Sequence, residues 1–208
     1  MHPYYETGWS RNLVYPHIGF DEMHFIDYFD QTKILREYIT DQELYDKIIK
    51  RYENRKNNEK LFFMGITMQN HGGYTETYDN FPENYYKVGR SYTDANQYLS
   101  LVHESDEAVK NLISYFSKVD DPVEIIFFGD HQPSLNSNFY PILNGKGLTG
   151  LTEDELEKLY TVPFFIWTNY DTPEETVDIT SLDYLSTMAL ERAGIELPAY
   201  NKFLADMQ

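Results

Sequence analysis

The chain contains 208 residues, somewhat long for one average domain and short for two. Its 41% hydrophobic and 25% charged residues are ordinary for a globular protein and exclude a disordered chain. The formal net charge of −17, from 17 basic and 34 acidic residues, argues against nucleic-acid and membrane-surface binding, which depend on a basic face. Cysteine is absent, which excludes disulfides, thiolate metal sites and cysteine catalysis.

Neither a membrane span nor a signal peptide is evident in the sequence. No segment reaches the roughly 20 apolar residues that a spanning helix needs. The first six residues lack the basic and apolar regions of a signal peptide. We therefore expect a soluble chain.

Three short apolar runs alternate with helical patterns, at residues 61–67, 123–128 and 162–167. Such nearly continuous apolar sequence is typical of strands that are covered on both faces. We therefore expect the three strands to be parallel neighbours. The predicted fold is α/β, with a doubly wound, mostly parallel sheet and helices on both faces.

Helix starts and ends are marked by specific residues. Thr40 with Glu43, and Thr152 with Glu155, each form the sequence pattern of a capping box. The longest helix is expected over residues 93–118, and another is expected to follow Thr180 and stop at Gly194. Residues 68–92 form a long polar loop, and loops of that length are often functional.

The first chemistry-bearing cluster, residues 129–133, follows the second apolar run. Asp130 and His131 are adjacent there, and both can turn onto one cation where the strand breaks at Gly129. Oxygen and nitrogen donors suit Mn²⁺ or Zn²⁺ and, less well, Mg²⁺. The alternative is that Asp130 caps a turn and His131 is a surface histidine.

Two further clusters contain histidine or arginine. His71 follows the first apolar run and precedes two glycines, where it could protonate a leaving oxygen or hold a phosphate oxygen. The alternative is a turn with His71 in solvent. Near the start, Trp9 and Arg11 offer a flat face and a bidentate anion contact. The alternative there is an amphipathic helix with Trp9 in the core.

Taken in order, these segments resemble the lipoteichoic acid synthase family, the phosphoglycerol transferase branch of the sulfatase and alkaline phosphatase superfamily. The similarity covers nearly the whole chain, and Gly-Asp-His-Gln-Pro at 129–133 is its most specific part. The matching segments are Trp9-Ser10-Arg11, Gly19-Phe20-Asp21, Asn70-His71, Gly129-Asp130-His131, and a helix from Asp178 to Gly194 with Ala193-Gly194-Ile195.

The resemblance implies roles for individual residues. It implies one divalent cation, Mn²⁺ first with Mg²⁺ or Zn²⁺ as alternatives, held in part by Asp130 and His131. It implies a catalytic and substrate-binding role for His71. The other residues that it assigns to the phosphoglycerol pocket are His2, Trp9 and Arg11. Tyr4 stands where the family usually has a polar residue.

The resemblance also implies what the whole protein does. Residues 1–208 resemble the C-terminal portion of the catalytic domain, with the nucleophilic threonine and a glutamate ligand N-terminal to them. Thr7, Thr67 and Thr75 do not occupy the matching context, so the chain alone is expected to be inactive. The donor would be a lipid-linked phosphoglycerol, and the acceptor a glycan or polyglycerolphosphate.

The implied location is the extracellular face of the bacterial cell membrane, with anchoring only through the preceding region. Two other hypotheses for the function remain open. One is a sulfatase or phosphodiesterase on the same scaffold, since fold does not fix substrate. The other is a non-catalytic module that binds phosphoglycerol.

Overall fold

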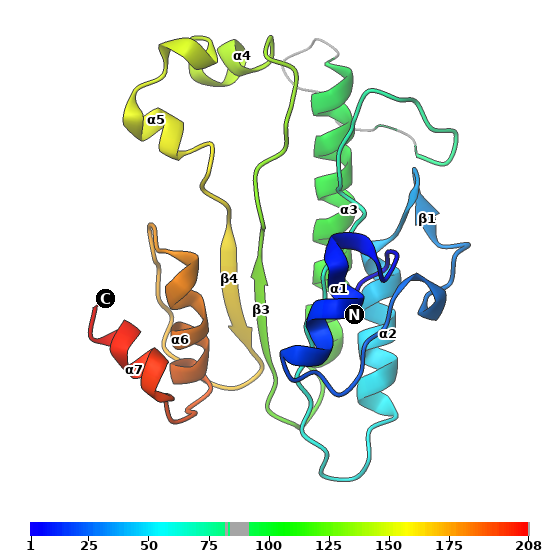
Figure 1. Cartoon of the computed structure of the whole chain (residues 1–208), viewed down its shortest axis with the longest axis vertical. Helices are drawn as coiled ribbons and strands as arrows, with labels where there is room; N and C mark the ends of the chain where they lie inside the picture. The colour runs from blue at the N-terminus through cyan, green and yellow to red at the C-terminus, as the bar shows by residue number, and fades with distance from the viewer. Residues whose placement is uncertain (82, 84–91, 208) are drawn as a thin grey trace. The chain divides into compact units, whose positions relative to one another are not determined.

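A computed structural model describes residues 1–81, 83 and 92–207 (Figure 1). The chain divides into two compact units. Unit 1 contains residues 1–114 and 133–156, and unit 2 contains residues 115–132 and 157–208. No helix in the described part of the chain is long and apolar enough to cross a membrane.

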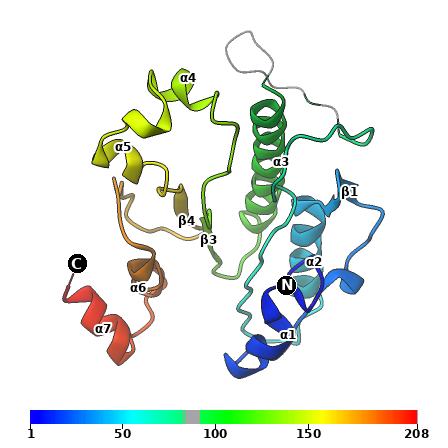
Figure 2. The same ribbon diagram turned by 45° about the horizontal axis from the view of Figure 1, so that its top comes forward.

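Unit 1 is mainly helical and contains one short hairpin. Its long helices α2 and α3 lie side by side in both views (Figures 1 and 2) and are joined by a hydrogen bond from Asn111 to Gln42 of 2.9 Å. The last two residues of α3 and the last residue of α5 belong to unit 2. In chain order the elements are η1 (Gly8–Ser10), α1 (Arg11–Val14), η2 (Tyr15–His17), η3 (Ile26–Tyr28), β1 (Ile34–Leu35), β2 (Tyr38–Ile39), α2 (Asp41–Glu53), α3 (Thr93–Phe116), α4 (Tyr140–Asn144), η4 (Leu148–Gly150) and α5 (Glu153–Glu157).

The predicted helix starts in unit 1 are confirmed. The Thr40 hydroxyl accepts the Glu43 amide at 3.2 Å, while the Glu43 carboxylate accepts the amide of Asp30 instead of closing the box. At α5 the box is complete, because Thr152 and Glu155 each accept the other's amide. The longest helix runs from Thr93 to Phe116, close to the predicted range.

The predicted strand at 61–67 is wrong: the structure assigns no strand to these residues. Instead, this segment bonds to the first residues of the chain. The Met1 nitrogen donates to Met64 O at 2.7 Å, and the Ile66 amide donates to Met1 O at 3.0 Å. The apolar run therefore forms isolated backbone pairs, and Phe62, 79% exposed, is not in a core.

Unit 2 contains β3 (Glu124–Phe128), β4 (Phe164–Thr168), α6 (Leu182–Arg192) and α7 (Ala199–Ala205). The two strands pair antiparallel, with Ile126 opposite Ile166. The prediction that they are parallel neighbours is therefore wrong, and the described residues do not form a doubly wound parallel sheet. An apolar run indicates that a strand is covered on both faces, but not whether it pairs parallel or antiparallel, because strands of either kind of pair can be covered on both faces.

Helix α6 begins one residue later than its predicted start and ends as expected. Ser181, not Thr180, caps it by accepting the Asp183 amide. At its end Gly194 has φ +66, the left-handed conformation that glycine adopts freely, and the Ile195 amide donates to Leu190 O. Helix α7 then packs beside α6 (Figures 1 and 2).

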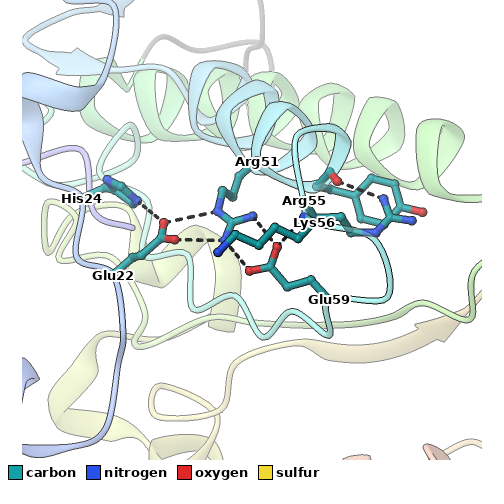
Figure 3. Close-up of polar contacts among 7 residues, drawn as sticks. Glu22, His24, Arg51, Arg55, Lys56 and Glu59 are labelled. Carbon is teal, nitrogen blue, oxygen red and sulfur yellow. Dashed lines mark hydrogen bonds and ion pairs between the residues drawn. The ribbon is translucent and has the colours of Figure 1, made fainter.

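An arginine near the end of α2 joins three segments of unit 1. Arg51 donates to Glu22 at 3.0 Å and to Glu59 at 2.9 Å, and Glu22 also contacts His24 (Figure 3). The Arg51 hydrogen bond holds the pKa of Glu59 at about 2, far below its usual range. The pairs are partly solvent-exposed, so each contributes modestly to stability, but together they fix the loop after α2.

Candidate functional site

Unit 1 brings together the four residues predicted to line a phosphoglycerol pocket. His2 and Trp9 have ring centroids 5.8 Å apart, and Trp9 and His71 have centroids 6.1 Å apart. Tyr4 and Tyr38 complete the group, with Tyr38 5.6 Å from His71. We name the set the His71 cluster. Its members are His2, Tyr4, Trp9, Arg11, Tyr38 and His71.

His2 is buried and serves as a neutral anchor. Its Nδ1 donates to Ile66 O at 3.0 Å, because a carbonyl only accepts. Its Nε2 therefore accepts from Arg11 Nη1 at 3.0 Å. Burial, with a smaller contribution from the nearby Arg11 charge, lowers the pKa of His2 to about 4, against the raising effect of the hydrogen bond to the Ile66 carbonyl. His2 is thus uncharged near neutral pH and orients Arg11.

Arg11 is held on two sides. Its Nε donates to the Tyr15 hydroxyl at 2.8 Å, and its guanidinium lies 4.4 Å over the Trp9 ring. None of the ion pairs among the described residues involves Arg11. A fixed, half-buried guanidinium without a carboxylate partner is suited to an anionic ligand.

Trp9 is exposed at 59%, so the alternative that placed it in the core is wrong. Trp9 and Ser10 have φ values of +52° and +55°, in the left-handed region that costs non-glycine residues about 1–2 kcal/mol each. This backbone turns the indole toward His71 and Arg11. Strain of this kind is tolerated where function needs a particular side-chain direction.

His71 is exposed and uses one ring nitrogen within the structure. Its Nδ1 lies 2.9 Å from Gly72 O and 3.3 Å from the Tyr38 hydroxyl. The carbonyl contact requires a proton on Nδ1, which leaves Nε2 as the base when the ring is neutral. No hydrogen bond to Nε2 occurs among the described residues. Proton transfer or a phosphate contact at this atom is therefore open to His71.

Sequence reasoning missed Tyr38, which touches the His71 ring from a position 33 residues earlier. No motif marks it, and only the hairpin of β1 and β2 brings it there. Tyr4, noted as a departure from the family pattern, packs on Trp9 at 5.8 Å and on Tyr38 at 6.3 Å. It contributes an aromatic face where a polar contact was expected.

Asp130 and His131 follow β3 in unit 2. His131 Nε2 lies 3.7 Å from Asp130 Oδ2, and both side chains are mostly exposed. Asp130 Oδ1 also accepts the His131 amide at 2.9 Å, as in the alternative of a capped turn. Gly129 lies just before them, and a Cβ there would lie 3.1 Å from Val162 Cβ, so a larger residue would require the Val162 side chain to shift by a few tenths of an ångström.

The donor set of Asp130 and His131 fits part of a divalent cation site. A carboxylate and an imidazole that approach each other match the oxygen and nitrogen ligands of Mn²⁺ or Zn²⁺. No group of three or more potential ligands occurs among residues 1–81, 83 and 92–207. The metal role stays a prediction. The sequence also predicts that this pair and His71 share one site, because they follow two apolar runs that were expected to be neighbouring strands, and this too stays a prediction because the pair and His71 belong to separate units.

Comparisons with known proteins place these features in a family. The sulfatase family model matches residues 1–195. A Rhizobium meliloti (strain 1021) protein named for cyclic beta-1,2-glucan modification is 27% identical over 212 residues, which cover 98% of this chain and 33% of that protein. A lipoteichoic acid synthase from Staphylococcus saprophyticus is 29% identical over 137 residues, covering 63% of this chain and 20% of the synthase.

A solved structure shows the same fold. The Streptococcus pyogenes phosphoglycerol transferase GacH, in complex with sn-glycerol-1-phosphate, matches with a TM-score of 0.77 and 21% identity, over 99% of this chain and 52% of that one. The chain thus has an alkaline phosphatase/sulfatase-like fold and spans about a third or less of the curated relatives described. Because the family model covers almost its whole length, the chain belongs to the sulfatase family, with lipoteichoic acid synthases among its relatives.

Proposed function

We propose that residues 1–208 are the C-terminal portion of the catalytic domain of a metal-dependent phosphoglycerol transferase. The donor is a lipid-linked phosphoglycerol, and the acceptor is a glycan or polyglycerolphosphate. The whole protein acts at the extracellular face of the bacterial cell membrane. Its membrane anchor lies outside these residues, and it uses no nucleic acid.

The observation that carries the proposal is the His71 cluster. Arg11 presents an oriented guanidinium to an anion, Trp9 presents an apolar face, and His71 presents a free Nε2. These three kinds of contact are suited to a phosphate ester of a short polyol. The relatives named for lipoteichoic acid synthesis and phosphoglycerol transfer support the same substrate class.

The proposed cation binds in part through Asp130 and His131. When bound, a divalent ion offsets charge on the phosphoryl oxygens and activates a hydroxyl nucleophile. Mn²⁺ is the first choice, with Mg²⁺ or Zn²⁺ as alternatives. We place the nucleophilic threonine and a glutamate ligand outside residues 1–208, following the family resemblance.

The test uses the full-length protein that contains this chain, with fluorescent phosphatidylglycerol as donor. We expect diacylglycerol release and phosphoglycerol transfer that require Mn²⁺ and stop with a chelator. His71→Ala should lower kcat about 100-fold, because a positioned acid or base contributes at least that factor. His17→Ala, at an exposed histidine with no predicted role, is the matched control and should keep the wild-type rate.

Three results would contradict the proposal, each in favour of another function. Hydrolysis of an aryl sulfate without lipid turnover indicates a sulfatase. Release of glycerol phosphate to water, with no product on any acceptor, indicates a phosphodiesterase. Binding of sn-glycerol 1-phosphate without turnover of any donor indicates a binding module.

A further inference from the structure

Arg36 occupies a strained position in the hairpin of unit 1. Leu35 pairs with Tyr38, so Arg36 and Glu37 form a two-residue turn. Arg36 has φ +55°, in the left-handed region, and its side chain is nevertheless buried. The Asn80 amide group donates to Arg36 O at 3.1 Å and holds this turn. A glycine or asparagine would form such a turn at lower cost, so the arginine side chain needs another explanation.

The guanidinium of Arg36 donates hydrogen bonds to the loop that contains His71. Nη2 donates to the carbonyls of Gln69 at 3.0 Å and His71 at 2.6 Å. Nη1 donates to the carbonyl of Gly73 at 2.9 Å and to the Gln97 side chain at 3.0 Å. One planar group thus binds three alternate carbonyls of a five-residue stretch, which fixes the backbone on both sides of His71.

This charge is buried without a carboxylate partner among the described residues. Its neighbours are instead the rings of Tyr38, Tyr74 and Tyr78, whose centroids lie 5.7, 5.4 and 5.9 Å from Cζ. Burying a charge without an oppositely charged partner is unfavourable, and hydrogen bonds and ring contacts offset the desolvation only in part. An apolar side chain would fill this space without the desolvation penalty of a buried charge, but it could not bind the three carbonyls.

The same hairpin also contacts the His71 ring. Tyr38, two residues after Arg36, places its hydroxyl 3.3 Å from His71 Nδ1. The hairpin therefore holds His71 twice, through its backbone by Arg36 and through its ring by Tyr38. Trp9 of the His71 cluster and Arg36 are two of the four non-glycine residues described with positive φ.

We infer that Arg36 is a positioning residue, which fixes the loop of residues 69–73 so that His71 Nε2 is presented to the phosphoglycerol. The inference rests on the proposed function of the His71 cluster. Arg36 itself touches no substrate in this scheme and acts through His71. Displacing a catalytic group by about 1 Å can cost on the order of 100-fold in rate.

The test is a double-mutant cycle in the full-length protein. Arg36→Lys keeps the charge but replaces the planar fork with a single ammonium that cannot bind four acceptors. We expect kcat for phosphoglycerol transfer to fall about 100-fold with KM within about 3-fold. In a His71→Ala background the same change should cost less than about 3-fold, because coupled residues are non-additive. Equal losses in the two backgrounds would overturn the inference.

Hydrogen exchange gives a readout that does not depend on activity. The His71 amide donates to Met68 O at 2.9 Å, and loosening of the loop should speed its exchange about 10-fold in Arg36→Lys. The control is Arg51→Lys, which breaks a different arginine network and should lower stability while leaving exchange at 69–73 unchanged. Unchanged exchange in Arg36→Lys would also overturn the inference.

Two precautions keep these outcomes separate. Arg36→Gln, which leaves no buried charge, replaces the lysine variant if that variant does not fold, with the same expected losses. If the wild-type protein neither binds sn-glycerol 1-phosphate nor transfers phosphoglycerol, the proposed function fails, and the exchange measurement still decides whether Arg36 holds the loop.

Discussion

At the scale of single residues, the His71 cluster depends on a neutral histidine that orients a charged arginine. His2 accepts a hydrogen bond from Arg11 only while its Nε2 is unprotonated. Burial keeps it so, since the pKa of His2 is lowered to about 4. The positive charge of Arg11 is not compensated by these hydrogen-bond partners, because the Tyr15 hydroxyl and the His2 ring are neutral. This charge is suited to an anionic ligand.

Arg11→Lys should therefore weaken binding of sn-glycerol 1-phosphate about 10-fold, which corresponds to about 1.4 kcal/mol. An ammonium group cannot bond Tyr15 and His2 together while it stacks on Trp9. Calorimetric titration of the wild-type and variant proteins measures the change.

Arg55→Lys is the matched control for this prediction. Arg55 also stacks on an aromatic ring, 3.9 Å over Tyr52, and lies outside the His71 cluster (Figure 3). Its replacement should leave the affinity within about 2-fold of wild type. If the Arg11→Lys protein binds sn-glycerol 1-phosphate as tightly as this control does, the guanidinium of Arg11 does not contact the phosphate.

Residues with a local motif could be predicted from the sequence, whereas those placed by distant contacts could not. His71 beside two glycines, and Trp9 near Arg11, were recognisable, and the structure places them together. Tyr38 and Arg36 were missed because they reach the loop of His71 from more than 30 residues away, with no motif of their own.

At the scale of elements, helix α2 begins on a buried polar network. Asp41 Oδ2 accepts from the Ser105 hydroxyl, and the Asp41 amide donates to Gln69 Oε1 at 3.1 Å. Asp41 Oδ1 has no hydrogen-bond partner among the described residues. Burial raises the pKa of Asp41 to about 6, against the lowering effect of the Ser105 bond.

This carboxyl should make stability fall as pH rises. An unfolded Asp titrates near 3.8, so between about pH 4 and pH 6 the folded state binds more protons than the unfolded state. The contribution of Asp41 to the free energy of unfolding should drop across that window, by on the order of 3 kcal/mol, whereas His2, whose pKa is lowered, contributes a rise with pH over an overlapping range. Asp41→Asn should remove most of this drop, as measured by urea denaturation at pH 4.5 and 7.5.

Asp46→Asn on the same helix provides the comparison. Asp46 is exposed and accepts from Gln42 at 2.8 Å, so its removal should leave the pH dependence of the wild type intact. If Asp41→Asn and Asp46→Asn follow the same pH profile, Asp41 is not the titrating group.

Helix caps were predictable because a cap is a contact between neighbours in sequence. Thr40 and Thr152 show this, with both hydroxyls bonded three residues ahead. Strand pairing could not be predicted in the same way, because the partner of Ile126 is 40 residues away, at Ile166. Apolar side chains do not show whether two strands pair parallel or antiparallel. The apolar run at 61–67 forms no strand, which shows that an apolar segment enters a sheet only where another strand lies beside it.

At the scale of the whole molecule, the two chemistries predicted from the sequence fall in different units. The His71 cluster belongs to unit 1, and Asp130 and His131 belong to unit 2. The fold of GacH extends over 99% of the chain, so both units belong to one family architecture. In the proposed function, anion recognition and cation binding depend on separate stretches of backbone, so a substitution should be able to remove either one without the other.

Asp130→Ala in the full-length protein should therefore abolish Mn²⁺-dependent transfer while leaving the affinity for sn-glycerol 1-phosphate, measured without metal, within about 2-fold. The reason is that a carboxylate supplies the anionic ligand on which cation affinity depends, whereas the contacts of Arg11, Trp9 and His71 do not include it. Mn²⁺ titration, followed by paramagnetic resonance, measures the first effect and calorimetry the second. Asp120→Ala, at an exposed aspartate of the same unit, should change neither. An Asp130→Ala protein with wild-type Mn²⁺ affinity would rule out this carboxylate as a ligand and would favour its role as the cap of the turn after β3.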